Sequence, residues 1–143
     1  MARYRVLKSI AHNSAHSLLA DSWWVDGAYF YEHLYDAARA ADSPVVEIDP
    51  LAGTIIPSTL ATGAVRHTLE HLPKAFREWV VTGGAAESMV QTARIRIEYD
   101  FIKSPPDPMS VPGRRRLYYT CTSEIVDDRG RTHRASVVPH WAY

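Results

Sequence analysis

Two pairs of histidines have a spacing that could bind a metal ion. His12 is followed by His16, and His67 is followed by His71. Residues four apart share one face of an α-helix, so the two imidazoles of a pair could hold a divalent cation such as zinc together with a third ligand. The glutamate of the His-Glu-x-x-His metalloprotease motif is absent from both pairs, so the spacing alone supports this hypothesis.

The surroundings of the two pairs differ. Charged residues lie near His67 and His71, away from the apolar positions of that segment, which is typical of a solvated helix face. Serines and an asparagine flank His12 and His16. We therefore take His12 and His16 as the candidates for a metal-binding or catalytic role, with hydrogen-bonded structural histidines as the alternative.

A second set of candidates lies in and after Gln91–Lys103, where polar and apolar side chains alternate. This alternation is typical of a half-buried β-strand with one polar face. The rows expected across this strand and the two that follow are Arg94–Glu124–Arg134, Arg96–Thr122–Ser136 and Asp100–Tyr118–His140. Such a face could bind a polar small molecule, with Glu98, Asp100 or His140 as general acid or base. The alternative is a solvent-facing sheet with weak cross-strand ion pairs.

Aromatic residues are concentrated between residues 23 and 35. The six are Trp23, Trp24, Tyr29, Phe30, Tyr31 and Tyr35. Because one helix cannot turn all of them inward, we expect Trp23, Trp24, Tyr31 and Tyr35 to contact a partner chain, to line a pocket or to pack under loops.

Other kinds of site find less support in the sequence. No Gly-x-Ser-x-Gly pattern and no glycine-rich phosphate loop occurs. Cys121 shares the parity of the apolar positions around it, which predicts a buried, inert thiol. Arg114–Arg116 is a short basic run, for which a solvated loop edge is favoured over a phosphate or nucleic-acid contact.

Length and composition indicate a single globular domain over residues 1–143. Apolar residues make up 46% of the chain and charged residues 22%. Sixteen basic and sixteen acidic residues cancel, so nucleic acid is not an expected partner. No apolar run approaches the length needed to cross a bilayer, and the one cysteine fits a reducing cytoplasm.

The elements that would position these residues follow from periodicity and turn chemistry. In chain order we predict a strand near 3–9 followed by a helix to about 20, and then a helix from 26–27 to about 41. A hairpin of 45–49 and 54–56 and a helix over about 64–81 come next. The last part is a meander of three strands that starts at 91–103 and continues through 115–126. Pro73 should kink the helix over 64–81 or divide it into two helices, and Pro139 indicates that the last strand is an edge strand. The predicted class is α+β, with two or three helices on the apolar face of an antiparallel sheet of four to six strands.

This order of helices, hairpin, helix and meander is similar to the cone-shaped nuclear-transport-factor-2-like fold, a similarity of topology without a motif. The leading functional hypothesis is a non-enzymatic cytoplasmic interaction module, homo-oligomeric through residues 23–35 or the edge strand. The alternative is a small-molecule-binding domain or small enzyme with a pocket between sheet and helices. His12, His16 and a meander carboxylate would supply its polar groups, and a divalent metal is the one cofactor considered.

Overall fold

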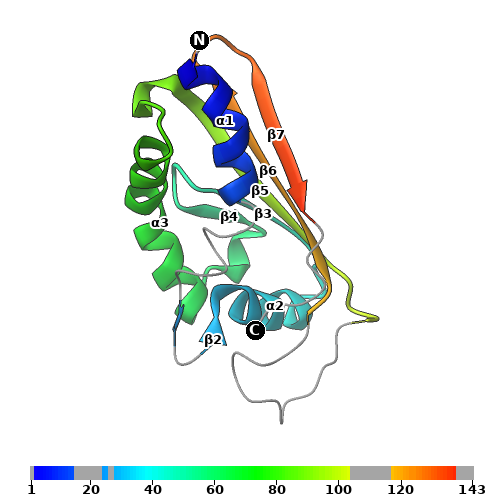
Figure 1. Cartoon of the computed structure of the whole chain (residues 1–143). Coiled ribbons are helices and arrows are strands. Elements are labelled where there is room, and N and C mark those ends of the chain that lie inside the picture. Colours follow the sequence, from blue (N-terminus) through cyan, green and yellow to red (C-terminus); the bar gives the residue numbers. More distant parts are fainter. Residues whose placement is uncertain (1, 15–23, 26–27, 104–116, 138–143) are drawn as a thin grey trace.

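Five strands form one antiparallel sheet. The computed structural model describes residues 2–14, 24–25, 28–103 and 117–137 (Figure 1). In order across the sheet the strands are β4 (Thr54–Ile56), β3 (Val45–Asp49), β5 (Val90–Tyr99), β6 (Tyr119–Asp127) and β7 (Thr132–Val137). The helices are α1 (Ala2–Asn13), α2 (Phe30–Ala40) and α3 (Gly63–Thr82), with single 3₁₀ turns η2 (Ser58–Leu60) and η3 (Glu87–Met89).

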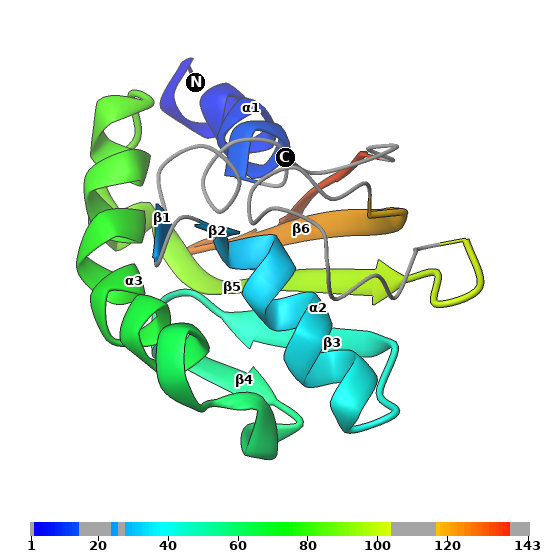
Figure 2. The same ribbon diagram turned by 90° about the horizontal axis from the view of Figure 1, so that it is seen from below.

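The three helices lie on the same face of the sheet (Figures 1 and 2), so the predicted α+β class is confirmed. Alternate side chains of β5 explain this arrangement, because Ile95 and Ile97 are fully buried on the helical side while Arg94 and Arg96, which alternate with them, are exposed. We call the face that carries these arginines the outer face. None of the helices in the described residues is long and apolar enough to cross a membrane.

The predicted register of the meander is confirmed. Arg94 lies opposite Glu124, and Glu124 lies opposite Arg134. The turn between β6 and β7 has Gly130 at φ 78°, the left-handed conformation that the short loop requires. In the described sheet β7 pairs with β6 alone and is an edge strand, as predicted.

The first strand of the meander is shorter than predicted. It ends at Tyr99, and residues 101–103 form a turn. The reason is a local hydrogen bond: Oδ1 of Asp100 accepts the backbone N–H groups of Ile102 and Lys103, each at 3.0 Å. An aspartate that binds backbone groups two and three residues ahead stabilises a turn in place of a strand.

The prediction of a strand near residues 3–9 is wrong. This segment is helical, in α1, and buries Leu7, Ile10 and Ala11. These residues are three and four apart, so one helix face covers β6 and β7. The alternation of a strand accounts for only some of the apolar residues in this segment, because it leaves out Leu7 and Ala11.

The second helix begins later than predicted. A two-stranded pair, β1 (Trp24–Val25) with β2 (Ala28–Tyr29), occupies the expected helix start, and α2 begins at Phe30. Phe30, Leu34 and Ala38 share one face of α2 and are fully buried.

The hairpin of β3 and β4 has the predicted bounds, and α3 matches the predicted helix within a residue at each end. Pro73 lies inside α3, so the alternative of two separate helices is wrong. Gly53 in the hairpin turn has φ +70° and approaches α3 closely, since a Cβ built there would lie 2.5 Å from the carbonyl oxygen of Leu69. Pro73 has no N–H to offer that oxygen, and only glycine leaves room for the turn against it.

Candidate functional site

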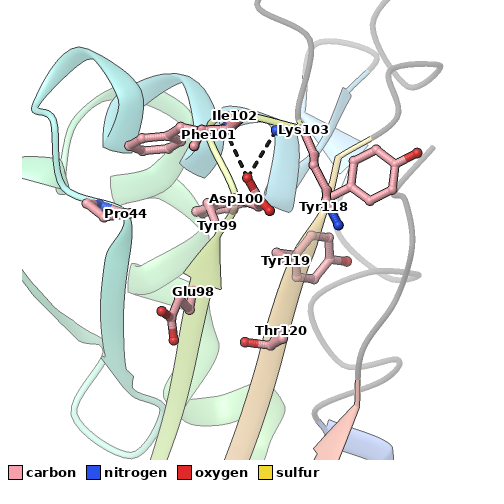
Figure 3. Close-up of a pocket in the computed structure, with 10 residues that line it drawn as sticks. All are labelled: Pro44, Glu98, Tyr99, Asp100, Phe101, Ile102, Lys103, Tyr118, Tyr119 and Thr120. Atoms are coloured by element: carbon pink, nitrogen blue, oxygen red, sulfur yellow. Dashed lines mark hydrogen bonds between the residues drawn. The ribbon is translucent and has the colours of Figure 1, made fainter.

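A pocket of about 690 Å³ lies where β5 ends next to the start of β6 (Figure 3). We call it the sheet-end pocket. Its described lining residues are Pro44, Glu98, Tyr99, Asp100, Phe101, Ile102, Lys103, Tyr118, Tyr119 and Thr120. They come from the end of β5, the turn after it, the start of β6 and the residue before β3.

Asp100 is the most firmly positioned polar residue of this pocket. Its Oδ1 caps the turn as described above, and its backbone N–H donates to the carbonyl oxygen of Tyr118 at 2.8 Å. Figure 3 shows the carboxylate hydrogen-bonded to the turn, close to the start of β6. Among the described residues, no partner is found for the second oxygen, Oδ2. That oxygen can accept a hydrogen bond from a ligand.

Glu98 and Thr120 form the next row of the pocket. They face each other across β5 and β6 (Figure 3). Oε2 of Glu98 accepts a hydrogen bond from Nη1 of Arg96 at 3.1 Å, and both side chains are about half exposed. The pocket therefore brings together two of the three predicted acid–base candidates, Glu98 and Asp100.

The apolar part of the pocket rests on a buried cluster of tyrosines. Tyr99 and Tyr119 belong to the hydrophobic core and are 3% and 6% exposed. The hydroxyl of Tyr99 donates to the carbonyl oxygen of Tyr31 at 2.8 Å, and the ring of Tyr31 stacks on that of Tyr119 with centroids 4.8 Å apart. Because these rings are packed and hydrogen-bonded, the base of the pocket is rigid.

Tyr31 and Tyr35, predicted to contact a partner chain, to line a pocket or to pack under loops, are inside the core, each 1% exposed. Both side chains turn inward from α2, and each hydroxyl has a polar partner. Nη1 of Arg39 donates to the Tyr35 hydroxyl at 3.0 Å, and the Tyr31 hydroxyl lies 3.7 Å from Sγ of Cys121. They lie behind the sheet-end pocket and outside its lining.

The described structure does not bring several other predicted site residues into the sheet-end pocket. His12 is exposed on α1, away from the sheet-end pocket lining. His16, Trp23, Arg114–Arg116 and His140 lie outside the described residues, and for Trp24 only the backbone is described. No group of three or more histidine, cysteine, aspartate or glutamate side chains suited to a metal ion occurs among the described residues. The metal hypothesis for His12 and His16 stays a prediction.

Charged side chains in the middle of the outer face form ion pairs with one another. Nε of Arg134 donates to Oε2 of Glu124 at 3.1 Å, and Nη1 of Arg94 lies 3.8 Å from Oε2 of Glu47. The arginines of these two pairs are exposed. This arrangement matches the alternative of a solvent-facing sheet with cross-strand ion pairs for the middle of the outer face. The candidate site is therefore the end of this face, where the sheet-end pocket lies.

The buried thiol of Cys121 is as predicted. The residue is fully buried, and burial raises the pKa of the thiol to about 11, although the Tyr31 hydroxyl acts in the opposite direction. A thiol with this pKa is protonated at neutral pH and is a poor nucleophile.

A buried carboxylate, Asp127, was missed by the sequence analysis. It accepts hydrogen bonds from Nε2 of His133 at 2.9 Å and from the backbone N–H groups of Arg129 and Arg131 at 2.9 and 3.0 Å. Burial alone would raise the pKa of Asp127, but these hydrogen bonds outweigh it and lower the pKa to about 2. Its donors are the turn itself and the adjoining strand, so Asp127 fixes the β6–β7 turn. The only signal in the sequence was its place at the start of that turn.

Comparison of the chain with models of protein families, with curated proteins and with solved structures found no match.

Proposed function

We propose that this protein is a small-molecule-binding domain and that its ligand occupies the sheet-end pocket. The observation that carries the proposal is a cavity of about 690 Å³ in which two carboxylates meet an aromatic wall. Ligand pockets typically have about 300–1,000 Å³, with mostly apolar walls and a few converging polar groups. The pocket is at the end of the sheet, which differs from the expected place between sheet and helices.

The lining residues indicate the chemistry of the ligand. Glu98 and Asp100 offer carboxylate oxygens as acceptors, and Thr120 adds a hydroxyl. Phe101 and Ile102 supply apolar surface, and Ile102 is 97% exposed. A small molecule with an apolar body and hydroxyl or amine donors at one end would satisfy both parts of the lining.

The rigid base favours binding. Tyr99 and Tyr119 are held in the core, and Asp100 is fixed by its turn. A site whose polar groups are already oriented loses little conformational freedom when the ligand arrives.

A thermal-shift screen with a broad set of amine- and hydroxyl-bearing metabolites tests the proposal. A ligand at 100 times its dissociation constant should stabilise the folded chain by about 2.7 kcal/mol, which raises the melting temperature by several degrees. Asp100→Asn keeps an oxygen to cap the turn but removes the charge, and Thr120→Val removes a hydroxyl without changing the shape. Both should weaken binding of the hit.

Thr132→Val is the matched control, because Thr132 is exposed on β7 outside the pocket lining. Its ligand affinity should equal that of the unchanged chain. Silence across the whole screen would reject the proposal. A ligand that binds Asp100→Asn and Thr120→Val as tightly as the control variant would reject the pocket as its site.

A second candidate function is homo-oligomeric assembly through β7. This strand lies at the edge of the described sheet with β6 as its only strand partner there. The unpaired backbone groups of an edge strand can pair with a strand of another chain. Light scattering after size exclusion tests it: a monomer at all accessible concentrations would reject assembly and leave the pocket proposal untouched.

A further inference from the structure

The exposed face of α3 carries a pair of histidines that the sheet-end pocket does not use. His67 and His71 are one helical turn apart, and both are exposed. Their ring centroids lie 4.6 Å apart with an angle of 50° between the ring planes. The sequence predicts a solvated helix face here, and in the structure the two exposed rings also lie side by side.

A backbone hydrogen bond fixes the protonation of one ring. Nδ1 of His71 lies 2.8 Å from the carbonyl oxygen of His67. Because a carbonyl oxygen can only accept, Nδ1 of His71 must carry the proton, and the lone pair of the neutral ring is then on Nε2. Histidines that bind metal ions usually donate their other ring N–H to a carbonyl or carboxylate in this way.

The separation of the rings suits a shared ion. With a metal–nitrogen distance of about 2.1 Å, the ion lies about 3.2 Å from each ring centroid. Two such rings are about 4.5 Å apart when the angle between their bonds to the ion is about 90°, and about 5.2 Å apart when the angle is tetrahedral. The observed 4.6 Å is therefore within reach of a chelate without refolding of the helix.

We propose that His67 and His71 together bind one divalent transition-metal ion, through Nε2 of His71 and a ring nitrogen of His67. Water completes the coordination, since the pair is open to solvent. Neutral imidazole suits Cu²⁺, Ni²⁺ and Zn²⁺, and Cu²⁺ should bind most tightly of the three. Imidazole must be unprotonated to bind a metal, so the affinity should fall as the solution is acidified.

Calorimetric titration of the full chain, prepared without a histidine tag, with Ni²⁺, Zn²⁺ and Cu²⁺ tests the proposal. One ion per chain is expected. His67→Ala leaves the carbonyl partner of His71 in place because that partner is backbone, yet it removes one ligand. It should weaken binding by more than about tenfold, since even the loss of an outer-shell partner costs about 10–100-fold. His71→Ala should do the same.

His12→Ala is the matched control, an exposed histidine on another helix, and its affinity should be unchanged. Because His67 and His71 are exposed, their alanine variants should keep the circular dichroism spectrum of the unchanged chain. Equal affinity in His67→Ala and the unchanged chain would overturn the proposal. Loss of binding in His12→Ala alone would overturn it as well, and would place the metal on α1.

Discussion

The close approach of the β3–β4 turn to α3 predicts that Gly53→Ala is strongly destabilising. Gly53 has φ +70°, and a Cβ at this position would lie 2.5 Å from the carbonyl oxygen of Leu69. It would also lie 3.1 and 3.2 Å from Cγ and Cδ of Pro73. Both neighbours belong to a continuous helix, so neither can rotate out of the way.

Two separate costs add up in this variant. A left-handed conformation costs an alanine about 1–2 kcal/mol relative to glycine. Overpacking a filled space typically costs a further 1–3 kcal/mol or so, and 2.5 Å is well inside the 3.4 Å at which ordinary contact begins. We expect Gly53→Ala to lose about 2–5 kcal/mol of unfolding free energy.

Gly130→Ala separates the two costs. Gly130 also has a positive φ, +78°, but no atom of the described chain lies within 4 Å of its Cβ position. It should lose only the conformational part, about 1–2 kcal/mol. Urea unfolding followed by circular dichroism gives both values, provided that the slope of the transition is unchanged. If Gly53→Ala were no more destabilising than Gly130→Ala, the close approach of the turn to α3 would be refuted.

Two further predictions concern ionisable groups of β6. The pKa of Asp127 is lowered from 3.8 to about 2 on folding, so its contribution to stability is complete above about pH 4 and is lost as the pH falls towards 2. The acid part of the stability curve should therefore be flatter for Asp127→Asn than for the unchanged chain, and coincident curves would contradict the assignment. The Cys121 thiol, with its pKa raised to about 11, should not react with a disulfide reagent at pH 8 until the chain is unfolded in urea. Rapid reaction of the folded chain would show that this thiol is accessible.

The meander could be predicted closely because several local signals agree there. Alternation fixed which face of each strand is buried, and the short turn ending at Gly130 fixed how the last two strands pair. The pairing of Arg94 with Glu124 then followed from opposite charge. One error remained, the end of β5, because the side chain of Asp100 turns the backbone away from the strand and periodicity does not record that.

The helical side of the sheet was harder to predict because the decisive contacts come from distant residues. The apolar residues of a segment as short as Ala2–Asn13 fit the helical period and the strand period in part. The segment is helical because its helix face packs on β6 and β7. From the sequence, residues 23–35 hold more aromatic side chains than one helix could bury, and Tyr31 and Tyr35 were expected among those left over. Their hydroxyls have partners in the fold, at Cys121 and at Arg39, and these partners lie far along the chain or depend on the helix being formed.

The distribution of charge on the outer face explains why the sheet-end pocket is the better functional candidate than the middle of the sheet. In the middle rows Glu47 and Glu124 each have an arginine of the same face within ion-pair distance. A ligand that bound there would have to displace such a pair. At the end of the face Asp100 uses one oxygen for its turn, and the pocket that it lines also has apolar residues in its lining. Hydrogen bonds formed next to apolar surface are exposed to less competition from water. A ligand therefore gains more from Asp100 than from any carboxylate of the middle rows, and Asp100→Asn should weaken binding where Glu124→Gln does not.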